Sequence, residues 1–158
     1  MDRNRSRCRR KSAWVSFIAL LALVVSFSLA GRSSKPDDPT AGLDLTTPEA
    51  TITAWYQAIS AGDIRLQKAL AQADSSSMRT AIEGSERLAK ARITYQVSDL
   101  EMRLLSNDGN RAKYQVKYNF QTISKRSKSE VQVGGALVSL IKIGNRWYII
   151  RVGDDLDE

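Results

Sequence analysis

Asp99 is the strongest acidic candidate among the few side chains in this sequence that could do chemistry. It stands where the apolar alternation changes phase, from odd positions in residues 93–97 to even positions in residues 100–104. A β-bulge at this point could aim Asp99 into a pocket near Tyr95, where a carboxylate could act as a general base. The same position suits an exposed polar residue at a strand irregularity. We favour that second interpretation and predict no catalytic residue.

Aromatic side chains form the second candidate site, a pocket for a small ligand. Such residues also serve as ordinary core, with their polar ring atoms reaching the rim. Both interpretations stay open for the six candidates, which are Trp55, Tyr56, Tyr95, Tyr114, Tyr118 and Trp147.

The composition excludes several classes of site. The chain has 158 residues, no histidine and one cysteine. It therefore has no Cys/His zinc site, no histidine-based catalytic triad and no intramolecular disulfide. We predict neither a metal nor a cofactor. An apolar content of 42% and a charged content of 26% are ordinary for a globular chain.

The basic charge is concentrated at the start of the chain. Residues 1–30 hold six basic residues and one acidic residue, whereas the rest of the chain holds 18 basic and 16 acidic residues. A nucleic-acid footprint needs basic residues gathered on a folded face, so we predict no nucleic-acid partner. The sequence instead predicts a basic cytoplasmic tail over residues 1–12, followed by an uncharged apolar segment over residues 13–30.

This apolar segment has the layout of either a transmembrane anchor or a signal peptide. Ser28 and Ala30 would permit cleavage before Gly31, whereas the cysteine that lipidation requires is missing there. Either reading leaves the basic end in the cytoplasm and sends the remainder across the membrane. The expected location is the inner membrane with an extracytoplasmic domain, or the periplasm or exterior after cleavage.

The remaining chain divides into a flexible linker (31–45), a folded domain (46–153) and an acidic tail (154–158). A helix is expected from the Thr-Thr-Pro-Glu start at residues 46–49, with Glu49 reaching back to the cap, and it should end at Gly62. A second helix follows Asp63, and a third covers about residues 75–91. From residue 92 the apolar period becomes two, which predicts about four antiparallel strands. The fold class is therefore α+β, with helices packed on a bent sheet.

Two features of the later strands bear on partners. Gly134-Gly135 predicts a bend or bulge. Leu137, Leu140 and Ile141 make both faces of their strand apolar, although helices can cover only one face. We expect the other face to dock an envelope protein or a second copy of the chain.

The order of elements resembles the cystatin-like cone fold shared with nuclear transport factor two and ketosteroid isomerase. The resemblance rests on residues 47–49, 54–58 and 62–63 for the opening helix and turn, and on residues 145–150 for the closing strand. More narrowly, the chain resembles small exported bacterial proteins and lipoproteins of unknown function. The resemblance implies a cavity inside the cone, and it covers enzymes, ligand binders and assembly domains alike.

These observations favour a membrane-tethered or exported domain that binds without catalysing a reaction. Two alternatives stay open. One is a small-molecule binder or isomerase-like protein that uses the cone cavity. The other is an inner-membrane component of a secretion or conjugation apparatus, because some such components share the order of cytoplasmic tail, single span and cone domain.

Overall fold

The computed structural model describes residues 38–153. The predicted basic tail, apolar segment and acidic tail lie outside these residues. The described residues all belong to one of the two units into which the chain divides, residues 36–158. Among the described helices, none combines the length and the apolar character needed to cross a membrane.

Three helices form where the sequence predicts them: α1 (Pro48–Ala61), α2 (Ile64–Leu70) and α3 (Ser76–Lys90). Each begins at a side-chain cap. The Thr47 hydroxyl caps α1, and the Asp63 carboxylate accepts a hydrogen bond from the Leu66 N–H at 2.9 Å to start α2. Gly62 ends α1 in the left-handed conformation, with φ 65°. Glu49 departs from the expectation: its carboxylate accepts a hydrogen bond from the Tyr114 hydroxyl instead of reaching back to the cap.

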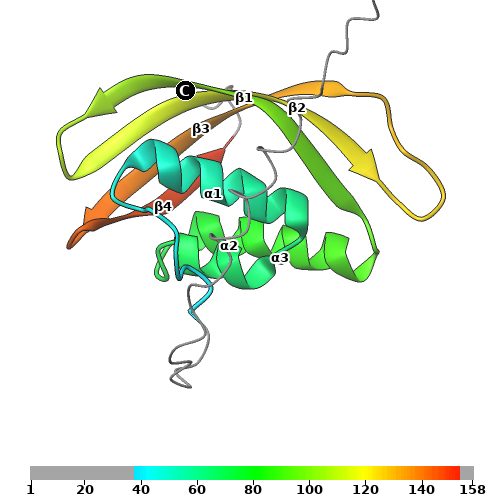
Figure 1. Ribbon diagram of the computed structural model, residues 1–158, viewed down its shortest axis with the longest axis horizontal. Coiled ribbons are helices and arrows are strands. Elements are labelled where there is room, and N and C mark those ends of the chain that lie inside the picture. Colours follow the sequence, from blue (N-terminus) through cyan, green and yellow to red (C-terminus); the bar gives the residue numbers. More distant parts are fainter. Residues whose placement is uncertain (1–37, 154–158) are drawn as a thin grey trace, which may run out of the picture. The chain divides into compact units, whose positions relative to one another are not determined.

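Four antiparallel strands make one sheet in the order β1-β2-β3-β4. They are β1 (Thr94–Asn107), β2 (Arg111–Ile123), β3 (Gln132–Ile143) and β4 (Arg146–Gly153). The sheet is strongly curved, and all three helices lie on its concave side (Figure 1). The predicted α+β class is therefore confirmed for the domain.

The predicted irregularity at the start of the sheet is also confirmed. The pairing of β1 with β2 shifts register between Ser98 and Glu101, and Asp99 has a φ of 51°. Next to it, the Val97 N–H donates to the Ser60 hydroxyl at 3.0 Å. This bond ties the bulge to α1, so the break in alternation lies at a fixed place beside the helix.

The double glycine is not a bulge, so of the two predicted alternatives, a bend or a bulge, the second is wrong. The register between β2 and β3 runs unbroken through Tyr118↔Gly134 and Lys117↔Gly135. A Cβ atom on Gly134 would lie only 2.6 Å from Cε2 of Tyr118. Gly134 therefore leaves room for the Tyr118 ring to lie against the backbone of β3.

The packed domain begins before Thr46, within the segment predicted as a flexible linker. Leu45 is 3% exposed and belongs to the hydrophobic core. Its carbonyl accepts a hydrogen bond from the Trp147 N–H at 3.0 Å, and Thr40 accepts one from the Arg146 guanidinium at 2.6 Å. These long-range contacts hold residues 40–45 against the last strand.

The two faces of the sheet differ in cover. The inner face packs on the helices and includes Ala136, Val138 and Leu140, all buried. Leu140 therefore lies on the inner face and does not belong to the outer face that we expected to dock a partner. The outer face carries the alternate residues of β3, with Leu137 and Ile141 half-buried and Val133 79% exposed.

Candidate functional site

A cavity of about 370 Å³ lies between α1, α3 and the inner face of the sheet. We call it the cone cavity. Three ring contacts organise its wall: Tyr56 to Tyr118 at 4.9 Å between ring centroids, Tyr95 to Phe120 at 6.0 Å, and Tyr118 to Phe120 at 6.1 Å. Its lining comprises Trp55, Tyr56, Ile59, Ala81, Gly84, Ser85, Leu88, Tyr95, Val97, Tyr118, Phe120 and Val152.

Four of the six predicted aromatic residues line this cavity: Trp55, Tyr56, Tyr95 and Tyr118. The cavity is of the size that small-molecule sites usually have, and its lining is mostly apolar. The shared wall brings together helix α1, strand β1 and strand β2, which are distant in the sequence.

Two polar atoms of this lining are buried and have no hydrogen-bond partner of standard geometry among residues 38–153: the Trp55 indole Nε1 and the Tyr56 hydroxyl, which has the Tyr118 side chain as a neighbour. Their side chains are 2% and 5% exposed. Burial, and then the neighbouring Tyr118, raises the pKa of Tyr56 well above its usual range, so its hydroxyl stays protonated. Unpaired buried donors are costly, and a bound molecule with an acceptor atom would satisfy them.

The other two predicted aromatics, Tyr114 and Trp147, lie outside the cavity lining. The Tyr114 hydroxyl donates to the Glu49 carboxylate, and the Trp147 indole donates to the Thr46 carbonyl at 3.1 Å. Both rings belong to the core, near the start of α1 and next to Leu45. We call this region the filled end, and at this end the aromatics are core residues.

Asp99 does not line the cone cavity. Its exposed carboxylate accepts hydrogen bonds from the Asn119 amide at 2.8 Å and from the Ser98 hydroxyl at 3.2 Å. It borders a different hollow of about 450 Å³, between α1 and β1, while Tyr95 lines the cone cavity. Within residues 38–153, no carboxylate lines the cone cavity, and no cluster of acidic, histidine or cysteine side chains could hold a metal ion.

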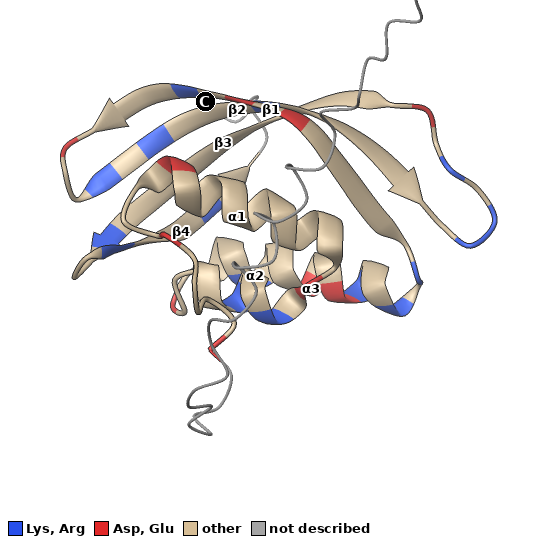
Figure 2. Cartoon of the chain, viewed as in Figure 1, with Lys and Arg blue, Asp and Glu red and all other residues tan. Residues whose placement is uncertain are grey.

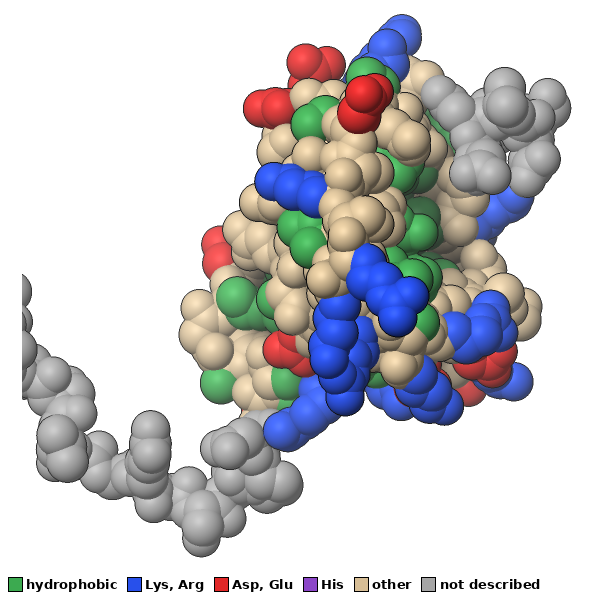
Figure 3. Space-filling model, turned by 90° about the vertical axis from the view of Figure 1, so that its right-hand side faces the viewer, with side chains coloured by type: hydrophobic (Ala, Val, Ile, Leu, Met, Phe, Trp, Pro, Cys, Tyr) green, Lys and Arg blue, Asp and Glu red, His purple; other side chains and the backbone are tan. Residues whose placement is uncertain are grey.

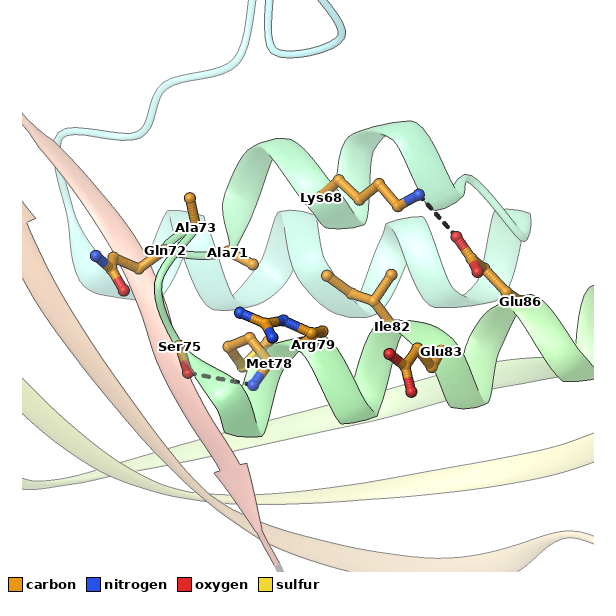
Figure 4. A pocket seen from close by; sticks show the side chains of 10 residues that line it. All are labelled: Lys68, Ala71, Gln72, Ala73, Ser75, Met78, Arg79, Ile82, Glu83 and Glu86. Carbon is orange, nitrogen blue, oxygen red and sulfur yellow. Dashed lines mark hydrogen bonds and ion pairs between the residues drawn. The ribbon is translucent and has the colours of Figure 1, made fainter.

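A further hollow of about 410 Å³ lies between α2 and α3 (Figure 4). Its floor is apolar, with Met78 and Ile82 buried. Lys68 of α2 reaches across to Glu86 of α3 in an ion pair of 2.7 Å. This pair lowers the pKa of the Glu86 carboxyl. The hollow has a charged rim, and it lacks the unpaired buried donors that distinguish the cone cavity.

The α3 wall of the cone cavity was missed by the sequence analysis. Ala81, Gly84, Ser85 and Leu88 recur at positions i, i+3, i+4 and i+7, which is one face of a helix. Three of these four residues are small, so the face leaves space where large apolar residues would fill it. Gly84 in mid-helix was a visible sign, because a helix interior normally avoids glycine.

Positive charge gathers near the end of α3 and the start of β1. Arg87 lies between two α3 lining residues, Lys90 and Arg92 follow the last of them, and the β2–β3 loop adds Lys125, Arg126 and Lys128. The loop lies beside the start of β1, because Thr94 pairs with Ile123 and Ile123 bridges to Lys128. Both groups lie at the same end of the fold (Figure 2). From that side, Lys and Arg side chains border hydrophobic ones (Figure 3).

The architecture is the cone fold of the nuclear-transport-factor-two-like proteins. The intermembrane-space region of the chloroplast protein ARC6 is similar over 71% of this chain and 98% of its own, with a TM-score of 0.53 and 14% identity. A nuclear transport factor 2-like superfamily protein from Salmonella enterica serovar Typhimurium is similar over 68% of this chain and 89% of its own, with a TM-score of 0.55 and 16% identity. The sequence matches no protein-family description and no curated protein.

Proposed function

We propose that the domain is a non-enzymatic binding module of the cell envelope, which docks a partner protein through the outer face of its sheet. The observation that carries this proposal is the apolar stripe on β3. Val133 and Ile143 are 79% and 51% exposed, and Leu137 and Ile141 between them are half-buried. All three described helices pack on the opposite side (Figure 1). An apolar stripe without cover is typical of a protein interface.

The charges beside the stripe suggest the chemistry of the partner. Lys117 pairs with Gly135, and both Lys113 of β2 and Arg151 of β4 pair with Ser139. The stripe is thus bordered by cations on both neighbouring strands. A partner segment with apolar residues and acidic neighbours complements this surface, whereas a second copy of the same face would bring like charges together.

A membrane or exported location fits this proposal and rests on the sequence of residues 1–30. The same sequence layout fits an inner-membrane component of a secretion or conjugation apparatus. Among the described residues that line the cone cavity there is no carboxylate, which favours binding over catalysis, because a general base has to reach the bound molecule.

The test is site-specific photo-cross-linking of the full chain in its native membranes. A photoreactive residue at Val133 should join one partner protein, whereas the same residue at the exposed Thr80 of α3 should not. Val133→Glu should reduce the amount of joined partner at least fivefold, and Thr80→Glu should leave it unchanged. Equal labelling from both positions, or a second copy of this chain as the product, would contradict the proposal.

The cone cavity supports a second candidate function, the binding of a small apolar molecule. The specific observation is the pair of unpaired buried donors, Trp55 Nε1 and the Tyr56 hydroxyl. A suitable neutral probe is 6-methoxy-2-naphthylacetamide, which offers rings for stacking and an ether acceptor. Gly84→Met should fill the cavity and abolish binding, because a Cβ at this position meets nothing closer than an Arg87 nitrogen at 4.0 Å. Thr80→Met on the same helix is the matched control.

A further inference from the structure

The mouth of the cone cavity carries a cation, the Arg87 guanidinium, that has no partner among residues 38–153. The Arg87 guanidinium folds back along α3 over Gly84: a Cβ atom on Gly84 would lie 4.0 Å from Arg87 Nη2. Gly84, three residues before Arg87, and Leu88, directly after it, both line the cavity. Arg87 therefore lies beside the cavity without forming part of its lining.

Arg87 is exposed, and its guanidinium makes no ion pair or hydrogen bond with any residue in the described range 38–153. The acidic residues of the same helix face elsewhere: Glu86 is paired with Lys68, and Glu83 lines the hollow between α2 and α3. Lys90 and Arg92 add positive charge after Arg87 (Figure 2). Among residues 38–153 no carboxylate forms an ion pair with the Arg87 guanidinium, so an anion at this mouth would meet its positive charge.

The interior of the cavity favours a different chemical group in a bound molecule. Its walls are aromatic rings, and its two donors without a partner of standard geometry among residues 38–153, on Trp55 and Tyr56, favour an acceptor atom. One molecule meets both preferences if it has an aromatic body with a neutral acceptor and carries one negative charge at the end that stays at the mouth.

We propose that the cone cavity binds an aromatic monoanion, with its rings between α3 and the sheet and its charged group beside Arg87. This inference rests on the second candidate function, the cavity as a small-molecule site, and adds the chemical class of the ligand. Arg87 sets specificity for charge, whereas Trp55 and Tyr56 hold the neutral acceptor inside.

The test compares two probes of nearly the same shape, 6-methoxy-2-naphthylacetate and its uncharged amide, by titration calorimetry on the full chain. We expect the acid to bind about two- to fivefold more tightly than the amide, as one partly exposed ion pair allows. Arg87→Gln should bring the ratio to about one and leave the affinity for the amide unchanged. Arg79→Gln, which removes an arginine of the same helix at the other hollow, should keep the wild-type ratio. Added salt should narrow the ratio.

The outcomes separate this inference from the function beneath it. If both probes bind equally, and Gly84→Met abolishes both, the cavity is a binding site and the preference for an anion is wrong. A preference for the acid that survives Arg87→Gln also overturns the role of Arg87. If neither probe binds, the cavity function and the inference fail together. Thermal unfolding of each variant shows whether a loss of binding reflects a loss of fold.

Discussion

Buried aromatic side chains lie near both ends of helix α1, against the same sheet. The two ends differ in whether the polar ring atoms of these side chains are hydrogen-bonded. At the filled end, Tyr114 and Trp147 bury their rings and give their hydrogen-bond donors to Glu49 and the Thr46 carbonyl. Towards the other end, Trp55 and Tyr56 are equally buried, and their donors have no partner among residues 38–153.

The difference teaches how core aromatics can be told from site aromatics. Ring burial is similar at both ends, so burial alone does not separate them. The hydrogen bonding of the polar ring atom does separate them. Where an aromatic residue serves only for packing, a hydrogen-bond partner for its buried donor stabilises the fold. In the described residues, a pair of donors without partners of standard geometry lies beside a cavity of about 370 Å³, and this supports the proposal that the cavity binds a small molecule.

The largest effect should come from emptying the filled end. Trp147→Ala should lower the free energy of unfolding by about 3–5 kcal/mol, because it leaves a cavity in close-packed surroundings. Tyr95→Ala should cost clearly less, since Tyr95 already borders empty space and is only half-buried. Urea denaturation measures both. Equal losses would mean that the two ends are packed alike.

A smaller loss is expected where the cavity wall meets the sheet. Gly134→Ala should cost about 1–3 kcal/mol, because the new methyl group would press on the Tyr118 ring at 2.6 Å. Gly135→Ala is the matched control, since its Cβ would make an ordinary contact of 3.7 Å with the Val116 carbonyl. The displaced ring should also weaken binding of the naphthyl amide. If both variants cost the same, the contact with Tyr118 does not explain the glycine.

Local signals were enough to predict most of the fold. The caps at Thr47 and Asp63 and the left-handed Gly62 are decided within a few residues, and the helices begin and end there as expected. The alternation of β2 likewise follows from its own sequence. The change of phase near Asp99 correctly marked a bulge.

What could not be predicted depends on contacts between distant residues. Leu45 looks like part of a linker until Trp147 packs beside it. Gly134 looks like a bulge until the Tyr118 ring is placed over it. The cone cavity exists because small residues of α3 lie opposite the rings of β1 and β2, a pairing that no single segment encodes. Sequence reasoning therefore found four of its aromatic residues and missed the α3 wall.

Removing single hydroxyls tests the comparison at the level of one hydrogen bond. Tyr114→Phe should cost about 1 kcal/mol, because it removes the donor to the Glu49 carboxylate. Tyr56→Phe should be neutral or slightly stabilising, since its buried hydroxyl has no partner of standard geometry in the described range. Chemical denaturation of the two variants in parallel decides the matter. A larger loss for Tyr56→Phe would show that its hydroxyl is satisfied after all.

Both hydroxyls should also make the fold sensitive to alkali. Burial raises the pKa of Tyr56 and of Tyr114 above the ordinary value of 10.0, and the Glu49 carboxylate adds to the shift at Tyr114. The unfolded chain then loses these protons at lower pH than the folded one. Their contribution to stability is complete below pH 10 and declines above it, by at most about 1.4 kcal/mol per pH unit for each group. Unfolding measured from pH 9 to 11 should show a shallower decline in each Phe variant.

The smallest effect is expected at Asp99, the residue that the sequence singled out. Its carboxylate is exposed and bonded to Asn119 and Ser98, and Asp99 is not among the residues that line the cone cavity. Asp99→Asn should therefore leave binding of both naphthyl probes unchanged. Asp99→Gly should alter stability by only a few tenths of a kcal/mol, because glycine adopts the φ of 51° without strain while its greater freedom in the unfolded chain works against the fold. A large loss of binding in Asp99→Asn would instead show that the hollow beside α1 and the cone cavity form one site. The comparison of the two ends of α1 would then have to include this hollow as a third region.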